Sequence, residues 1–215
     1  MLSNYFMLLL KGTGVSIGAW ILAGSVSLFL GTLLGILSAR QLKLTKTRYL
    51  IRVYSFITKG VPAYVQILIA YFVIPALLGI NLSGFLAATL ALAFCSSGYI
   101  TEIIRGGINS ISKGQWEACR VLGYPTKITL RYVILPQATR NILPALLGEL
   151  EQLLKSTALL ATIGVTELTR TGMNIISREL NPIPVYLTIA AIYLILSAIL
   201  NLITFKLEQR LNLGN

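Results

Sequence analysis

The sequence contains no histidine and no aspartate, so all seven of its acidic residues are glutamates. These absences remove imidazole bases and histidine ligands from any catalytic or metal-binding hypothesis. The two cysteines, Cys95 and Cys119, are too few for a disulfide framework or a metal cage. A glycine-rich phosphate loop ending in Lys-Ser or Lys-Thr is also missing, so the chain has no visible means of binding ATP itself.

Charged residues are scarce as well. They make up 12% of the 215 residues, against about 25% in soluble domains, while 55% are hydrophobic and the mean hydropathy is +0.78. This composition is typical of an integral membrane protein. The net charge of +11 could indicate nucleic-acid binding. We favour cytoplasmic loops in contact with the bilayer and no nucleic-acid partner, because the basic residues cluster beside apolar runs and lack interleaved aromatic residues.

Apolar runs predict five membrane-spanning helices, since a helix needs about 20 apolar residues to cross the hydrocarbon core. The uncharged run 60–101 is too long for one helix, and we expect Pro75 and the turn-like segment 79–84 to divide it. A less obvious span contains Glu149, Glu151 and Lys155. The predicted spans are 12–39, 60–78, 84–104, 141–165 and 182–205. The sequence therefore predicts an all-α integral membrane protein with a single transmembrane domain over residues 1–215.

Basic residues are distributed unequally between the two sides of these spans. One side holds Arg40, Lys43, Lys46, Arg48, Arg52, Lys59, Arg105, Lys113, Arg120, Lys127, Arg131, Arg140, Lys206 and Arg210. The opposite side holds only Lys11, Arg170 and Arg178. Because basic residues mark cytoplasmic loops, we expect the N-terminus outside and the C-terminus in the cytoplasm. The first span is too long for a cleavable signal and lacks a basic flank before it.

The first predicted span carries glycines four residues apart, at Gly14-x-x-x-Gly18 and Gly31-x-x-x-Gly35. Small residues at this spacing allow two helices to approach closely within lipid. We favour close packing within the chain, with contact to a second copy as the alternative.

The polar, basic segment 105–140 contains a helical pattern. Apolar residues recur at helical spacing: Trp116, Ala118, Cys119 and Leu122. Gly123-Tyr124-Pro125 should stop a helix, because glycine suits a left-handed C-terminal position and proline prevents continuation. The sequence predicts a short amphipathic helix that ends at Gly123. This helix could lie on lipid, but its apolar face is short and its polar face carries an acid, so we favour a groove on another protein.

Motifs in this segment resemble those of the permease subunits of ABC importers. The family pattern is Glu-Ala-Ala, three residues, Gly, nine residues, Ile, one residue and Leu-Pro. The chain has Glu117-Ala118-Cys119, Gly123, Val133 and Leu135-Pro136 at that spacing. The resemblance extends to the polar amino acid branch of this family, in segments 98–108, 113–118, 131–138, 154–159 and 163–168.

The chain departs from that branch at two points. It has Lys59-Gly60-Val61-Pro62 where Arg-Gly-Thr-Pro is usual. It also has Lys155-Ser156-Thr157 where the family lysine is followed by an aspartate, so one intramembrane charge is missing.

The resemblance implies the type I ABC importer permease fold and a chain without catalysis that moves polar amino acids into the cytoplasm. It implies a second permease copy or a similar chain, an ATPase dimer that binds ATP and magnesium, and an extracytoplasmic binding protein, in a bacterial inner membrane. No cofactor is expected in this chain. In such permeases the Glu117–Gly123 helix is the coupling helix that docks on the ATPase. The contacts expected there are Gln115, Trp116, Glu117, Ala118, Arg120, Gly123 and Pro125.

Three charged residues in the fourth predicted span are unfavourable, because insertion of one charge at the centre of a membrane helix costs about 2.5–3.5 kcal/mol. Glu151 and Lys155 are four residues apart and can form an ion pair that satisfies both. The alternative is that Glu149, Glu151 and Lys155 share one face that lines a wet cavity, with hydroxyls from Ser156 and Thr157. Pro144 and Gly148 could kink the helix and open such a cavity.

A cavity of this kind could bind an amino acid. Two acids against one base favour a cationic substrate such as arginine, lysine or histidine. Further candidates for the pathway, each with ordinary helix packing as the alternative, are Gln66, Tyr64, Ser96, Ser97 and Tyr99.

Two other functions account for less of the sequence. A stand-alone secondary transporter or channel could use the Glu151 and Lys155 span for ion coupling, but five spans show no inverted repeat and the loop helix would have no purpose. A membrane anchor or assembly factor would leave the buried charges unexplained.

Overall fold

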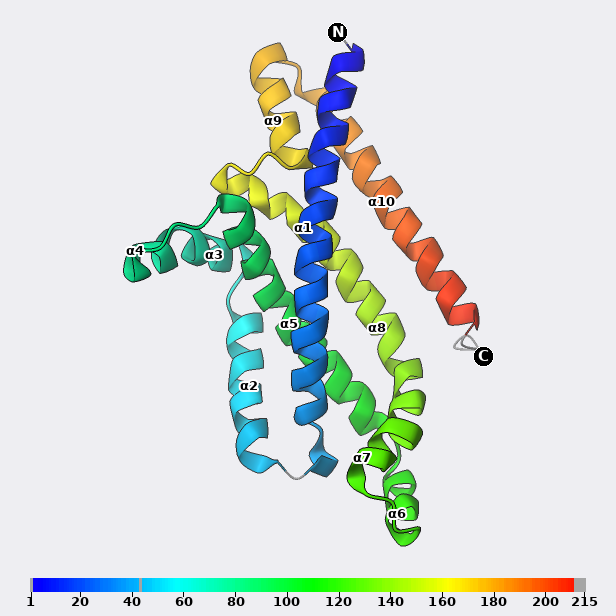
Figure 1. Ribbon diagram of the computed structural model, residues 1–215. Coiled ribbons are helices and arrows are strands. Elements are labelled where there is room, and N and C mark those ends of the chain that lie inside the picture. The colour runs from blue at the N-terminus through cyan, green and yellow to red at the C-terminus, as the bar shows by residue number, and fades with distance from the viewer. Residues whose placement is uncertain (1, 43, 211–215) are drawn as a thin grey trace.

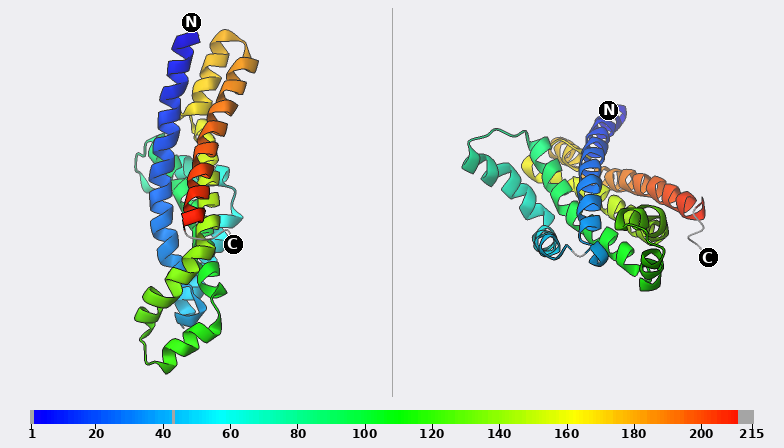
Figure 2. Two further views of the ribbon diagram at one scale, coloured as in Figure 1. Left: turned by 90° about the vertical axis from the view of Figure 1, so that its right-hand side faces the viewer. Right: turned by 60° about the horizontal axis from the view of Figure 1, so that its bottom comes forward.

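The computed structural model describes residues 2–42 and 44–210, so Lys43 of the predicted cytoplasmic set lies outside the described residues. Within this part of the chain all regular elements are helices, which confirms the all-α fold. The longest are α1 (Leu2–Leu37), α5 (Gly84–Ser110), α8 (Leu135–Ser156) and α10 (Pro182–Arg210). α1, α5 and α8 pack against one another, and α10 runs beside α8 from the N-terminal end of the molecule (Figures 1 and 2).

α1 begins ten residues before the predicted span, because an exposed Lys11 on its surface does not interrupt the helix. Its last third packs closely on α5. A Cβ at Gly31 would lie 2.6 Å from Cβ of Ile100, and one at Gly35 would lie 2.5 Å from Cβ of Ile104. Close packing within the chain is therefore confirmed for this glycine pair. The earlier pair differs, since added Cβ atoms at Gly14 and Gly18 would meet no described atom within 4 Å.

The second predicted span is one arm of a bent pair. α2 (Thr45–Gly60) meets α3 (Ala63–Leu68), the π-helical segment η2 (Ile69–Val73) and α4 (Ile74–Leu78) at an angle of 98°. In Figure 1 the α3–α4 arm extends sideways from the bundle. Pro62 marks this bend, whereas Pro75 lies in the first turn of α4, where a missing N–H is tolerated. The expected division of the run is confirmed at the turn, since α4 ends at Leu78, Gly79 has φ +64° and α5 begins at Gly84, but Pro75 itself does not end a helix.

A glutamine side chain holds the bend. The Gln66 amide donates to the carbonyl oxygens of Thr58 and Val61, each at 2.7 Å. Only glycine fits at position 98 of α5, which faces Thr58 on α2, because a Cβ at Gly98 would lie 1.8 Å from Oγ1 of Thr58. The predicted pathway residue Gln66 therefore fixes the angle between α2 and α3.

The segment 105–140 is far more helical than a loop. α5 continues to Ser110, and α6 (Lys113–Val121), α7 (Thr126–Ile128) and the π-helical η3 (Thr129–Ile134) follow. α8 then begins at Leu135, six residues before the predicted span, because Pro136 suits the first turn of a helix. After Ser156 the chain tightens into the 3-10 segment η4 (Thr157–Ile163).

Three helices of the described chain are long and apolar enough to cross a membrane, at Tyr5–Leu37, Gly84–Ser110 and Pro182–Gln209. The bent pair of α2 with α3–α4 could provide a fourth. α8 does not meet the same standard, because Glu149, Glu151 and Lys155 lie within it. Its place in the membrane therefore depends on where those polar side chains point.

A buried glutamate closes the end of the bundle that carries the N-terminus. Glu167 is fully buried and caps α9 (Leu168–Glu179), a helix that sequence reasoning did not predict, by accepting from the N–H groups of Thr169 and Arg170. Ser16 on α1 and Tyr193 on α10 also donate to it. Burial raises the pKa of Glu167, and these four hydrogen bonds oppose that rise.

Candidate functional site

α6 lies at the end of the molecule opposite the N-terminus (Figure 1). One large aromatic side chain attaches it to the bundle. Trp116 is only 4% exposed and belongs to the apolar cluster that includes Ile108, Ile134 and Ala138. Cys119, one turn further along, is buried too. The expectation that Trp116 contacts an ATPase is therefore corrected: its indole faces the interior of the chain and holds α6 in place.

The predicted end of this helix is confirmed. Gly123 has φ +77°, its N–H donates to Arg120 O at 3.0 Å, and the N–H of Tyr124 donates to Cys119 O at 2.9 Å. This pair of bonds is the Schellman arrangement, which satisfies the last carbonyls of a helix and favours glycine at the left-handed position. The chain turns sharply there, so α6 presents a well-defined end.

The outer surface of α6 combines polar and apolar groups. All the predicted contact residues other than Trp116 are exposed: Gln115, Glu117, Ala118, Arg120, Gly123 and Pro125. Beside them Val121 is 88% exposed, Leu122 68% and Tyr124 47%. We call these three side chains the α6 tip. The helical spacing groups Leu122 with Trp116 and Cys119, but α6 ends at Val121, and Leu122 is exposed whereas the other two are buried.

The two acids of α8 lie on different faces of the helix, because residues two apart point about 200° from each other. Ser96 Oγ on α5 donates to Glu149 Oε1 at 2.7 Å. Glu151 instead pairs with Lys155, with 2.7 Å between Oε1 and Nζ, beside α10. The ion pair that the spacing allowed is therefore present. The alternative of one face shared by all three charges is wrong.

Glu149 is a carboxylate without a basic partner among the side chains that the structure describes. Among residues 2–42 and 44–210 the ion pairs are Glu102–Arg105 and Glu151–Lys155, and neither includes it. Glu149 is half-buried, and the exposed Tyr99 lies one turn beyond Ser96 on α5. A carboxylate that already accepts from one hydroxyl can still accept from an ammonium or guanidinium group. Of the predicted pathway residues, Glu149 is the best placed to bind a cationic group.

Glu151 and Lys155 line a groove of about 740 Å³ between α8 and α10. Its other polar residues are Tyr193, Ser197 and Asn201, all from α10. The Lys155 side chain is half exposed. A charge in this position within a membrane needs water or a protein partner, because hydrocarbon would leave it unsolvated.

The remaining predicted pathway residues are mostly occupied within the chain. Ser156 Oγ donates to Gln152 O at 2.9 Å, and Thr157 Oγ1 donates to Leu154 O at 2.7 Å, so neither hydroxyl reaches Glu149. Ser97 Oγ similarly donates to Phe94 O at 2.6 Å. Tyr64 is exposed. The described residues include no group of three or more acidic, histidine or cysteine side chains placed to hold a metal ion.

A continuous stripe of exposed residues runs along α8 between the faces of Glu149 and Glu151. It consists of Asn141, Pro144, Ala145, Gly148, Gln152 and Lys155, and α8 passes through Pro144 without a break in the helix. These positions recur at helical spacing, and none carries a large apolar side chain. We call them the α8 stripe. A polar stripe of this kind within a membrane faces protein or water.

The chain matches a family of known proteins over most of its length. The family described as the binding-protein-dependent transport system inner membrane component matches residues 31–213. Among individual relatives, the arginine transport system permease protein ArtQ of Bacillus subtilis is 34% identical over 206 residues, 94% of this chain and 92% of its own. The glutamine transport system permease protein GlnP of Escherichia coli strain K12 is 34% identical over 207 residues, 96% of this chain and 94% of its own.

Solved structures agree in fold. One chain of an amino acid ABC transporter crystallised with histidines superposes with a TM-score of 0.89 and 32% identity, over 97% of this chain and 96% of its own. An inward-facing structure of the MetNI methionine ABC transporter gives a TM-score of 0.84 at 19% identity, over 98% of this chain and 99% of that one. The second likeness concerns the fold alone.

Proposed function

The chain belongs to the family of binding-protein-dependent transport system inner membrane components, and from this premise we propose that it is the permease subunit of an ABC importer for polar amino acids. The observation that carries this proposal is similarity over nearly the whole chain to permeases named for arginine and for glutamine. ATP would be bound and hydrolysed by partner subunits, and this chain would supply the path through a bacterial inner membrane.

We propose that α6 is the contact with the ATPase. The α6 tip is apolar and exposed at the far end of the bundle, where no membrane-spanning helix of the described chain covers it. Exposed apolar groups beside Glu117 and Arg120 suit a groove with an apolar floor and polar rims. Because Trp116 anchors α6 to α5 and α8, a movement of α6 would be passed to those helices.

We propose that the α6 end faces the cytoplasm and the N-terminus faces outside. The start of α2, with Lys46 and Arg48, lies at the same end of the molecule as α6 in Figure 1, while α9 lies at the N-terminal end. The excess of basic residues at one end supports this orientation. An extracytoplasmic binding protein would then meet the end that carries α9.

We propose that substrate passes along the α8 stripe, between this chain and a second permease subunit. α8 has an exposed face with Asn141, Gln152 and Lys155 and without large apolar side chains, and within a membrane water or protein would have to cover it. Glu149 stands at the edge of that face without a basic partner among the described residues. Since Lys155 neutralises Glu151, one free carboxylate remains, and we favour cationic amino acids on that basis.

Two matched substitutions test the substrate assignment. Each variant would be reconstituted in vesicles with its ATPase and binding protein, and uptake of labelled arginine and glutamine would be measured. We expect Glu149→Gln to lower arginine uptake about tenfold or more, since hydrogen bonds to charged groups contribute about 1.5–3 kcal/mol. Glu151→Gln keeps the same size on the opposite face and should change uptake far less.

The two substrates separate the possible roles of Glu149. Loss of both uptakes in Glu149→Gln would mean that the carboxylate binds the ammonium group common to all amino acids. Loss of arginine uptake alone would mean that it reads the cationic side chain. Unchanged uptake of both substrates in Glu149→Gln would contradict the pathway role.

A further inference from the structure

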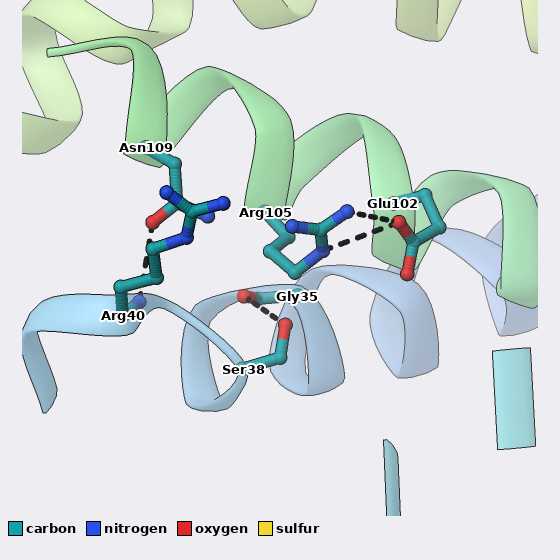
Figure 3. A network of polar contacts seen from close by, with 6 residues as sticks. All are labelled: Gly35, Ser38, Arg40, Glu102, Arg105 and Asn109. Carbon is teal, nitrogen blue, oxygen red and sulfur yellow. Dashed lines mark hydrogen bonds and ion pairs between the residues drawn. The ribbon is translucent and has the colours of Figure 1, made fainter. Parts of the chain in front are cut away.

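A cavity of about 280 Å³ lies where the 3-10 segment η1 (Arg40–Leu42), the last turn of α5 and α6 meet. Its lining includes Arg40, Asn109 and Trp116, one from each of these elements. The backbone N–H of Arg40 donates to Asn109 Oδ1 at 3.1 Å and joins η1 to α5 (Figure 3). In the same view the Arg40 side chain reaches up beside Asn109, while Arg105 is turned to its ion pair with Glu102.

Three buried polar groups, each on a residue that lines this cavity, have no hydrogen-bond partner among the described residues. They are Nε1 of Trp116, Nδ2 of Asn109 and Oε1 of Gln41. Trp116 is 4% exposed, so its indole N–H is removed from bulk solvent. Buried polar groups in native proteins are nearly always paired. Two of these three groups are donors, which suits a ligand that accepts hydrogen bonds.

The charges around the cavity point to an anion. Arg40, Lys113 and Arg120 line it, against the single acid Glu117. The donors come from η1, α5 and α6, so they approach the cavity from several directions. A phosphate group offers oxygen acceptors in several directions, and arginine binds phosphate especially well. A single planar carboxylate would leave more of these donors unpaired.

The cavity also lies where two candidate membrane spans end. Arg40 follows three residues after Leu37, where the first candidate span ends, and Asn109 lies in the last turn of the span that ends at Ser110. Basic pockets at the cytoplasmic ends of membrane helices attract the headgroups of anionic lipids. This position favours a ligand that the bilayer itself carries.

We propose that this cavity binds a phosphate group, carried by the headgroup of an anionic phospholipid of the cytoplasmic leaflet. The ligand would connect η1, α5 and α6 through the donors of Arg40, Asn109 and Trp116. A lipid so bound would hold α6 against the bundle. This site goes beyond the proposed transport function, and only its assignment to the cytoplasmic leaflet rests on the proposed orientation.

Lipid and phosphate titrations of the permease, purified with its partner subunits in a neutral detergent, test the site. Phosphatidylglycerol, phosphatidylcholine and inorganic phosphate would be added separately, and bound species counted by native mass spectrometry. Melting temperature would be followed in parallel. We expect one phosphatidylglycerol per permease chain to bind about tenfold or more tightly than phosphatidylcholine. The adduct mass identifies the source, and saturable binding of inorganic phosphate alone would retain the phosphate site but overturn its lipid assignment.

The variants are chosen to leave the local fold in place. Arg40→Gln removes the guanidinium but keeps the backbone N–H that bonds Asn109. Trp116→Phe removes the indole N–H but keeps an aromatic side chain in the apolar cluster. Each should weaken phosphatidylglycerol binding about tenfold, the effect of losing one hydrogen bond to a charged group. Arg131→Gln is the matched control, because Arg131 is exposed at the same end of the chain and does not line the cavity.

Three outcomes would overturn the phosphate site. One is binding of neither phosphatidylglycerol nor phosphate to the wild type. Another is an equal loss in Arg131→Gln and Arg40→Gln, which would mean general attraction to positive charge. The third is loss of the ATPase from Arg40→Gln with phosphatidylglycerol binding unchanged, which would make the cavity a protein contact.

Discussion

The α6 tip and the α8 stripe both differ in polarity from their surroundings, but in opposite senses. The α6 tip exposes Val121, Leu122 and Tyr124 at the end of the bundle, where water is expected. The α8 stripe exposes residues such as Gln152 and Lys155 along a helix that packs among apolar spans. Each surface is unfavourable for an isolated chain and becomes favourable when a protein or a wet pathway covers it. Exposed groups of the wrong polarity therefore mark where this chain is incomplete.

The largest expected effect concerns the anchor beneath the α6 tip. Trp116→Ala should lower the free energy of unfolding by about 3–5 kcal/mol, because a buried tryptophan is lost and a cavity remains. Denaturant unfolding of the purified permease in detergent would measure this loss. Trp116→Phe fills more of the space and should lose clearly less. Equal stability of Trp116→Ala and the wild type would show that α6 is not held by this side chain.

The next effect concerns the α6 tip itself. Leu122→Glu places a charge on an exposed apolar position and should weaken ATPase binding by about 2 kcal/mol or more, the size of an interface hot spot. Co-purification of the ATPase with the tagged permease measures it, and the melting temperature of the permease should stay unchanged. Leu180→Glu is the control, since Leu180 is 85% exposed at the other end of the bundle. Equal co-purification in both variants would remove the α6 tip from the interface.

The sequence predicts some features of α6 and not others. The end of α6 at Gly123 was predictable, because the glycine and proline signals act locally and Gly123 has the expected positive φ. The side of α6 on which Trp116 lies was not predictable, since an amphipathic pattern cannot tell an inner apolar face from an outer one. Leu122 shows the same limit: its helical spacing groups it with Trp116 and Cys119, but it follows the end of α6 at Val121 and is exposed.

The other differences from the sequence predictions have two origins: contacts between residues distant in the chain, and helix faces that a count of charges does not separate. The bend of 98° after Gly60 lies in an uncharged run, and it is held by Gln66 and by the close approach of Gly98 to Thr58. Helical geometry alone predicts that Glu149 and Glu151 lie on different faces of α8, whereas a count of charged residues does not distinguish them. The cavity between Arg40, Asn109 and Trp116 joins segments about seventy residues apart, so no local pattern could show it.

A third prediction asks whether the α8 stripe is wet. In a background with Cys95→Ala and Cys119→Ala, Gln152→Cys should react with a water-soluble, membrane-impermeant thiol reagent in the assembled transporter. Leu187→Cys on α10 is the control, because Leu187 is 66% exposed on an apolar surface that suits lipid. We expect Gln152→Cys to react about tenfold faster, since hydrocarbon excludes both the ionised thiolate and the charged reagent. Equal, slow reaction at both positions would mean that the stripe is dry, sealed by a protein partner.

The smallest expected effect is the most direct measure of the environment of α8. A double-mutant cycle compares Glu151→Gln, Lys155→Met and the variant that carries both changes. Unfolding of the assembled permease in detergent measures the free energy of each. If the groove beside α10 is wet, the coupling energy should be about 0.3–0.5 kcal/mol, as for exposed helix pairs four residues apart. Removal of one partner from a dry pair would instead cost about 3–5 kcal/mol, because the remaining charge would be buried alone. A coupling of that size would place the Glu151–Lys155 pair in a sealed contact with another subunit, and the wet surface of α8 would then be confined to the side of Glu149.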